Sequence, residues 1–229
     1  ETAATSSATN ERTVRMAPSA FPGVAPRVQE RLYTAVLAAG GGSLAWIDDV
    51  GALHNGPQSA GADPGPACYG HGNAVPTNTD ANVALGRLGT SLAGGNIMLD
   101  GGAAEKAVIT GVAEPLGMSK DEAAKSIVSV ANANMADAVR LISISRGYDP
   151  RDFALVAFGG AGALHGVALA KELAIPTVIV PPNPGVTSAL GCLLVDIRHD
   201  LAQSYLMPAS AADAGDIETK FSEMESEAR

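Results

Sequence analysis

The residues whose types and spacing best suit a binding or catalytic site form a glycine-rich turn, Gly159–Gly162, followed by His165. The apolar run Phe153–Phe158 precedes the turn without polar alternation, which predicts a strand covered on both faces, as in a parallel sheet. A strand, a glycine turn and a helix N-terminus form a general site for a nucleotide or another anion, because glycine lets the backbone approach the ligand and the first helical N–H groups point toward it. A tight connection between strand and helix, without any ligand, has the same pattern.

Two common nucleotide motifs do not fit this turn. A dinucleotide fingerprint requires Gly-x-Gly-x-x-Gly and an acidic residue after the next strand, but His165 stands where the third glycine belongs. The next predicted strand, Thr177–Val180, ends in two prolines and no carboxylate. A Walker loop is excluded because the chain has no Gly-Lys-Ser/Thr. An actin-like ATPase, in which a strand, a Gly-Gly turn and a helix hold the adenosine, stays open.

The longest predicted helix lies just before this turn in the sequence. Ser119 and Glu122 form a capping-box pattern in an acidic first turn, which predicts the start of a helix that ends at Gly147. Asn134 shares the apolar face of this helix, so we expect it to tie the helix to a loop or to reach the cleft. The residues that form this face are Ile127, Val130, Ala131, Ala138, Leu141 and Ile142. After the glycine turn, a helix and then Thr177–Val180 predict a right-handed parallel βαβ unit.

A second glycine run, Gly40–Gly42, precedes a predicted hairpin. Short strands are expected at Leu44–Ile47 and Ala52–His54. The long stretch Gly56–Gly72 follows, and its prolines favour an ordered loop packed on the core.

Asp80 lies at the start of a predicted short helix. Its side chain can cap the open N–H groups of that helix, which is the interpretation we favour. A carboxylate at a junction between loop and helix can also hold Mg²⁺ through water, so Asp80 is the candidate metal ligand.

Composition limits the classes of function. The chain has 229 residues and a net charge of −9, with no basic run to neutralise nucleic-acid phosphates. Cys68 and Cys192 are far apart and belong to no Cys-x-x-Cys, so we expect two buried thiols in a reducing cytoplasm. No membrane association is expected, because we find no uninterrupted apolar stretch of about 18 residues.

The expected organisation has three parts. Residues 1–30 predict an extended or partly disordered lead-in, residues 31–206 an α/β domain, and residues 207–229 an acidic helical tail or linker. Within the α/β domain, Asn183 is expected to cap a helix over Gly185–Leu194, whose small residues indicate that something packs closely on it.

Several long motifs resemble the hydantoinase A/5-oxoprolinase/acetone carboxylase family. They include GGGSLAWIDDVGALHNGPQSAGADPGPACYGHG at Gly40–Gly72, PTNTDAN at Pro76–Asn82 and ANANMADAVRLISISRGYDPRDFALVAFGGAG at Ala131–Gly162. VIVPPNPGVTSALGCLLVDIRHD at Val178–Asp200 also resembles the family. The chain departs from it at Tyr33–Ala39, where the family usually has a run like His-Thr-Ile-Gly-Ala.

The resemblance implies an α/β fold of the actin-like ATPase (ribonuclease H-like) type, with a mixed sheet flanked by helices and incomplete in this chain. It implies ATP-dependent activation of a carbonyl oxygen by phosphorylation, with hydrolysis of a cyclic amide as the favoured outcome. A subunit of an ATP-dependent ketone carboxylase is the alternative, and a non-catalytic interaction subunit is a third. The implied cofactors are ATP and Mg²⁺, and the residues implied to contact the nucleotide are Gly40, Gly41, Gly42, Gly159, Gly160, Ala161, Gly162 and His165.

The family's phosphate loops, Asp-x-Gly-Gly-Thr, are not found in the 229 residues. We therefore expect these loops to come from a partner polypeptide or from an upstream segment, and the resemblance also implies a hydantoinase B-like subunit. The substrate is expected to be a small lactam or ketone.

Overall fold

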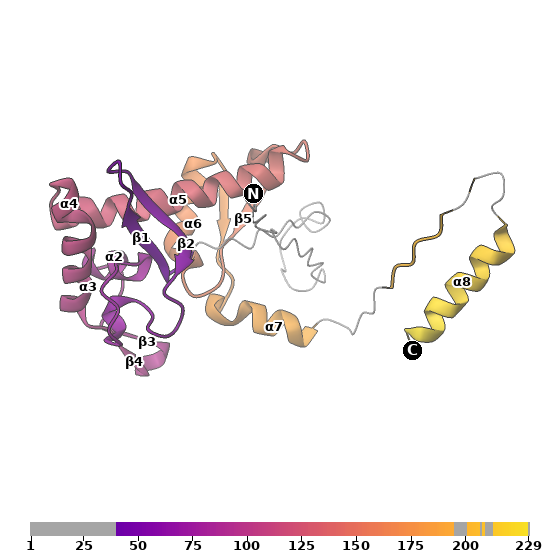
Figure 1. Cartoon of the computed structure of the whole chain (residues 1–229), viewed down its shortest axis with the longest axis horizontal. Coiled ribbons are helices and arrows are strands. Elements are labelled where there is room, and N and C mark those ends of the chain that lie inside the picture. Colours follow the sequence, from indigo (N-terminus) through magenta and orange to yellow (C-terminus); the bar gives the residue numbers. More distant parts are fainter. Residues whose placement is uncertain (1–39, 195–200, 207, 209–212, 229) are drawn as a thin grey trace. The chain divides into compact units, whose positions relative to one another are not determined.

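The computed structural model describes residues 40–194, 201–206, 208 and 213–228. The predicted lead-in lies outside the described residues. The chain divides into two units, Glu1–Ser188 and Ala189–Arg229. The helices and strands confirm the predicted α/β class (Figure 1). Their order and bounds are β1 (Ser43–Ile47), β2 (Leu53–Ser59), η2 (Ala67–Tyr69), α2 (Asn78–Ala84), β3 (Ser91–Leu92), η3 (Ala93–Gly95), β4 (Ile97–Met98), α3 (Gly101–Val108), η4 (Ile109–Ala113), α4 (Glu114–Leu116), α5 (Lys120–Ile144), η5 (Pro150–Asp152), β5 (Ala154–Val156), α6 (Gly162–Glu172), β6 (Thr177–Ile179), η6 (Pro184–Val186), α7 (Thr187–Leu194) and α8 (Ala214–Glu227).

The described strands form three two-stranded sheets, β1-β2, β3-β4 and β5-β6. The first is the predicted antiparallel hairpin, with Trp46 opposite His54. These two rings stack with centroids 4.5 Å apart, and the Trp46 indole N–H donates to the Gly56 carbonyl. At the turn, the Asp48 carboxylate contacts His54 Nε2 at 2.7 Å and accepts two backbone N–H groups. Side-chain contacts therefore hold the two strands together and stabilise the turn of this hairpin.

Helix α5 is the predicted long helix, and it begins with the predicted capping box. The Ser119 hydroxyl accepts from the Glu122 N–H, while the Glu122 carboxylate accepts from the Ser119 N–H. Asn134 is exposed, not buried as its place on the apolar face had suggested, but its side-chain amide donates to the Asn55 carbonyl of β2. The predicted tie between this helix and another segment is confirmed.

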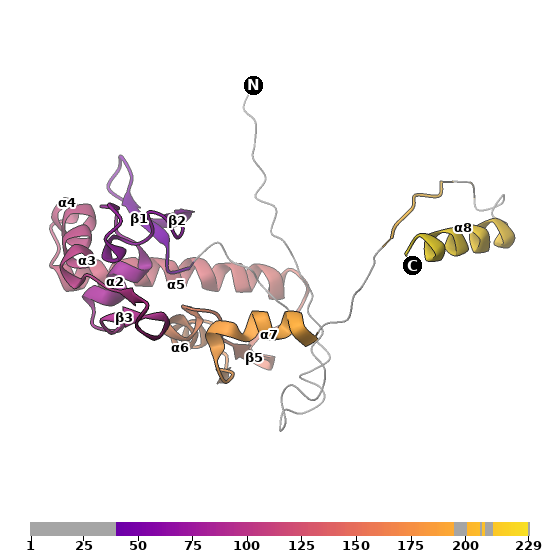
Figure 2. The ribbon, with the colours of Figure 1, turned by 90° about the horizontal axis from the view of Figure 1, so that it is seen from below.

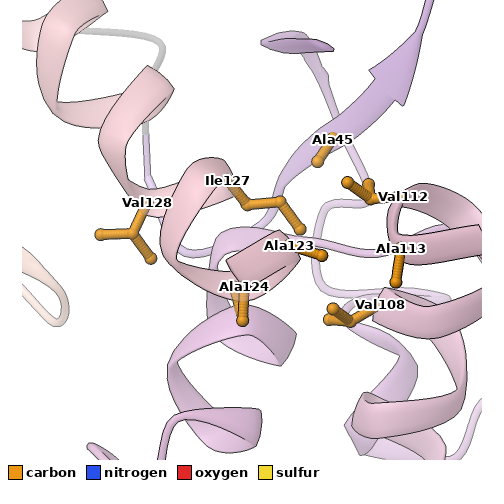
Figure 3. Packing of buried hydrophobic residues seen from close by; sticks show 9 residues of the cluster. Ala45, Val108, Val112, Ala113, Ala123, Ala124, Ile127 and Val128 are labelled. Carbon is orange, nitrogen blue, oxygen red and sulfur yellow. The ribbon is translucent and has the colours of Figure 1, made fainter. Parts of the chain in front are cut away.

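One hydrophobic cluster forms around the N-terminal half of α5 (Figure 3). Its buried members are mostly alanine and valine, so the elements approach closely. At the joint between α3 and α4, a Cβ added to Gly111 would lie 2.6 Å from Pro76 Cδ, which explains why glycine stands there. The cluster joins β1, α2, α3 and η4 to α5 through Ala45, Ala81, Val108, Val112, Ala113, Ala123, Ala124, Ile127 and Val128.

A second cluster forms around the C-terminal half of α5, where it meets α6 and the β5-β6 sheet (Figure 2). Strands β5 and β6 are parallel, as predicted. The residues of β5 are only half-buried, so the prediction of a strand covered on both faces was wrong. The apolar run sits in a sheet that has just two strands among the described residues, so less of its surface is covered. The cluster's buried residues are Ala131, Met135, Ala136, Leu169, Ala170, Leu173 and Ile175.

Polar contacts on the surface support the same packing. The Arg140 guanidinium on α5 donates to the side chain and the backbone carbonyl of Glu172, at the end of α6. It also donates to Asp137 on its own helix. These exposed ion pairs orient the helices more than they stabilise them.

Helix α5 is also long and apolar enough to span a membrane, by length and composition alone. One such helix is weak support for a span, because the core helices of soluble proteins pass the same test. Both hydrophobic clusters pack on α5, and 28% of its most apolar 18-residue window is buried.

Toward the C-terminus the predicted elements are present, with two corrections. Asn183 precedes a proline-led turn and α7, but it adopts a left-handed conformation (φ 55°) and its side chain makes no capping hydrogen bond. Cys192 on α7 is exposed and only Cys68 is buried, so one of the two buried thiols was predicted wrongly. The acidic helix is α8, which Asp213 caps by accepting the Asp216 N–H.

The first cluster predicts that alanine substitutions at two isoleucines of α5 change the free energy of unfolding by very different amounts. Ile127 is fully buried, whereas Ile144 is more than half exposed. Ile127→Ala should lower the free energy of unfolding by about 2–5 kcal/mol, because it removes buried methyl groups and leaves a cavity. Ile144→Ala, the matched control, should change it by less than about 0.5 kcal/mol. Urea unfolding followed by circular dichroism measures both, and equal effects would show that this cluster does not support the fold.

Candidate functional site

The turn between β5 and α6 is held in place by its neighbours, but no atom lies near the position of an added Cβ at Gly159 or Gly160. The Ala157 N–H donates to Ile179 of β6, and the Gly159 N–H donates to the Pro184 carbonyl. Gly159 has φ of 90°, which favours glycine. Gly160 lacks a positive φ, and a Cβ added there would meet nothing within 4 Å. The backbone at Gly160 therefore faces open space, as a ligand-binding turn requires.

The start of α6 lies very close to the strand before it. A Cβ added to Gly166 would be 2.9 Å from the Ala157 Cβ, so this glycine allows close packing of helix on strand. A Cβ added to Gly162, the first residue of α6, would be 3.5 Å from the Ala157 backbone, which is ordinary contact. In the first helical turn the Leu164 N–H donates to the Ala161 carbonyl, which leaves the Gly162 and Ala163 N–H groups for an acceptor.

His165 is the buried polar group of this site. Its ring is 2% exposed, and Nδ1 lies 2.7 Å from Asn132 Oδ1 on α5. The other ring nitrogen, Nε2, is buried and has no hydrogen-bond partner. Burial and the positive charge of Arg87 lower the pKa of His165 below its usual 6.5. The unfolded chain then binds the proton more readily than the folded chain does. The free energy of unfolding that the neutral ring supports is therefore complete above about pH 6.5, and it falls as the pH drops toward the folded pKa.

The glycine triplet has a different environment. The Gly41 carbonyl accepts from both the N–H and the hydroxyl of Thr79, and the Gly40 carbonyl accepts from the Asn78 side chain. A Cβ added to Gly41 would be 2.6 Å from Thr79 Oγ1, and one added to Gly42 would be 2.9 Å from Ser59 Oγ. The triplet therefore packs against the start of α2 and the end of β2, and its contact with a nucleotide stays a prediction.

Asp80 is fully buried and takes part in the capping box of α2, but the N-cap residue is Thr77 and Asp80 lies three positions after it, inside the helix. Its Oδ2 accepts from the N–H and hydroxyl of Thr77 and from the Ala67 N–H, while Oδ1 accepts from the Cys68 N–H. This carboxylate joins the loop around η2 to the start of α2. Burial and the Asp80 charge raise the pKa of the Cys68 thiol, which stays protonated.

A metal role for Asp80 gains no support from its surroundings. Its oxygens are engaged by protein donors, and among the residues that the structure describes no group of three or more His, Cys, Asp or Glu could hold a metal ion. The magnesium role of Asp80 stays a prediction.

Asparagines connect the two glycine runs through α5. Asn78, which holds the Gly40 carbonyl, exchanges side-chain hydrogen bonds with Asn55, and the Asn55 carbonyl accepts from Asn134. Two residues earlier on α5, Asn132 contacts His165. Sequence reasoning missed Asn55, Asn78 and Asn132. The alternation Ala131-Asn132-Ala133-Asn134 was the available signal, because asparagine is a poor helix former and needs a reason to stand there twice.

Comparison with known proteins agrees with the resemblance seen in the motifs. The family model described as Hydantoinase/oxoprolinase matches residues 7–201. The chain belongs to the hydantoinase/oxoprolinase family. Caprolactamase subunit alpha of Pseudomonas jessenii is 50% identical over 165 residues, which are 72% of this chain and 24% of that protein. The acetophenone carboxylase gamma subunit of Aromatoleum aromaticum is 42% identical, covering 77% of this chain and 24% of that subunit.

Solved structures of the family share this fold. The crystal structure of the ATP-dependent caprolactamase from Pseudomonas jessenii matches 70% of this chain and 23% of its own, with 49% identity and a TM-score of 0.64. The nucleotide-free acetone carboxylase structure matches 83% of this chain and 28% of its own, with 28% identity and a TM-score of 0.67. The chain thus spans about a quarter of the length of these family members.

Asp80→Asn separates the capping role from the metal role. The amide has one acceptor oxygen and brings its own N–H donors toward those of the backbone, so we expect a loss of roughly 3 kcal/mol in unfolding free energy. Asp100→Asn is the matched control. Asp100 caps α3 from an exposed position, where asparagine caps equally well.

Urea unfolding of both variants, with and without Mg²⁺, provides the measurement. A stable Asp80→Asn protein that has lost a Mg²⁺-dependent gain in stability would contradict the cap and favour the metal.

Proposed function

We propose that this chain is the adenosine-side part of an ATP-dependent enzyme that activates a carbonyl group for attack. The observation that carries the proposal is the parallel β5-α6-β6 unit, whose turn leaves the backbone open at Gly160 directly before a helix N-terminus. The family of the chain supports ATP as the nucleotide, since a caprolactamase relative is described as ATP-dependent.

The residues present fit a nucleoside. Gly159 provides the bend of the turn, Gly160 gives access to the backbone, and the start of α6 offers the N–H groups of Gly162 and Ala163. His165 adds one buried nitrogen that still lacks a partner. ATP supplies a phosphoryl group that converts a carbonyl oxygen into a better leaving group. The role of this chain would be to hold and orient the nucleotide, and such positioning provides a large share of catalysis in phosphoryl transfer.

Hydrolysis of a cyclic amide is the reaction we favour. The caprolactamase relative is 50% identical, against 42% for the acetophenone carboxylase subunit and 31% for the acetone carboxylase beta subunit of Xanthobacter autotrophicus. We therefore propose a lactam substrate over a ketone.

A complete site requires phosphate loops and a cation that this chain does not supply by itself. We propose that a partner polypeptide carries the Asp-x-Gly-Gly-Thr loops together with the Mg²⁺ ligands, and that a hydantoinase B-like subunit completes the assembly. Relatives named as alpha, beta and gamma subunits support a multi-subunit enzyme. A cytoplasmic location, where ATP is available, fits this assignment.

Gly160→Val should abolish nucleotide binding and leave the fold intact. An added Cβ meets no atom of the chain within 4 Å, so the side chain enters the space that we assign to the ligand. Gly89→Val is the matched control, because a Cβ at Gly89 also meets nothing within 4 Å. Calorimetric titration with ADP, alongside circular dichroism, tests the pair. Unchanged ADP affinity in a folded Gly160→Val protein would remove the turn from the site.

The purified chain alone should show no measurable ATPase activity, whereas its complex with the partner subunits should hydrolyse ATP when a lactam is added. Without phosphate loops, nothing aligns the reacting phosphoryl group. The assay compares lactams with ketones, and ketones are tested with and without bicarbonate. Strong substrate-dependent ATP cleavage by the chain alone would contradict the division of the site between polypeptides.

A further inference from the structure

The orphaned nitrogen of His165 is the feature of the site that still needs an explanation. Buried polar side-chain atoms normally have a hydrogen-bond partner, and leaving one unpaired costs about 1–3 kcal/mol. His165 Nε2 and Asn82 Oδ1 are the two such atoms among the described residues. His165 follows the open turn by a few residues on α6, within the first helical turn.

The partner of the other ring nitrogen determines what Nε2 can do. Asn132 Oδ1 can only accept a hydrogen bond, so at 2.7 Å it requires a proton on His165 Nδ1. In the neutral ring Nε2 then carries a lone pair and no proton, and it can only accept.

The position of Asn132 allows it to keep the His165 proton on Nδ1. It stands on α5, whose packing against α6 is fixed by the second hydrophobic cluster on either side of it, at Ala131 and Met135. The contact with His165 therefore does not depend on a mobile loop. Nearby, the charge of Arg87 disfavours a second proton on the ring.

We infer that Asn132 is a positioning residue, which fixes His165 so that Nε2 accepts a hydrogen bond from an amino or hydroxyl hydrogen of the bound nucleoside. The inference rests on the proposed nucleotide site and adds the direction of the hydrogen bond and the residue that sets it. Phosphate oxygens are excluded as partners of Nε2, because they too are acceptors.

The test uses the full-length chain together with its partner subunits, with histidine labelled with ¹⁵N. The chain has four histidines, so the His165 signals can be assigned by comparison with His165→Gln. Nitrogen chemical shifts should show the proton on Nδ1, and the Nε2 signal should move when ADP is added. Asn132→Ala should give a mixture of tautomers and weaken ADP binding roughly three- to tenfold. Asn132→Asp, which keeps the acceptor, should restore the Nδ1–H form and most of the affinity.

Ser143→Ala is the matched control. It removes hydroxyl hydrogen bonds to the Val139 and Arg140 carbonyls within the same helix, and should leave both the tautomer and the ADP affinity unchanged. Inosine diphosphate, 2′-deoxy-ADP and 3′-deoxy-ADP distinguish the adenine amino group from the two ribose hydroxyls. The analogue that lacks the true donor should bind more weakly than ADP to the natural protein but equally to Asn132→Ala.

The outcomes separate the two proposals. If the assembled natural protein binds no ADP, the nucleotide site itself is wrong. If ADP binds while the Nε2 signal stays where it was, a buried water or an empty space explains the orphaned nitrogen, and the inference is overturned. A proton found on Nε2 instead of Nδ1 would also overturn it.

Discussion

Both hydrophobic clusters of the chain depend on packing against a single helix, α5. Its first half closes the cluster of β1, α2 and α3, and its second half closes the cluster of α6, β5 and β6. The buried residues of α5 are mainly alanines, with Ile127, Val128 and Met135. Small side chains bring the neighbouring backbones close, so little freedom is left in how each cluster sits on the helix. The asparagines that lead toward the two glycine runs, Asn132 and Asn134, stand where the two clusters meet.

The sequence predicts the elements whose causes are local. The capping box at Ser119 and Glu122, the hairpin after Gly42 and the strand–turn–helix around Gly159 each need only a few neighbouring residues, and the structure contains all three. What could not be predicted joins distant segments. The bond from Asn132 to His165 spans 33 positions, and Thr79 reaches Gly41 across 38. No periodicity encodes such pairs, because they depend on how complete elements pack.

The two glycine runs show why composition alone misjudges a site. Gly41 is required because the Thr79 hydroxyl occupies the place of a side chain, so this glycine serves packing. At Gly160 no atom of the chain lies within 4 Å of that place, so packing does not require the glycine. The two runs have similar sequences. Only the atoms around the missing Cβ distinguish a glycine that allows close contact within the chain from one that packing does not require.

The hairpin also determines what optical experiments on this protein can see. Trp46 is the single tryptophan of the chain, and its ring stacks on His54 within β1-β2. Intrinsic fluorescence excited at the red edge of the spectrum therefore reports on the surroundings of this exposed ring in the hairpin. Binding at the glycine turn, by contrast, can leave the signal unchanged, so a silent titration by fluorescence carries no information about that turn.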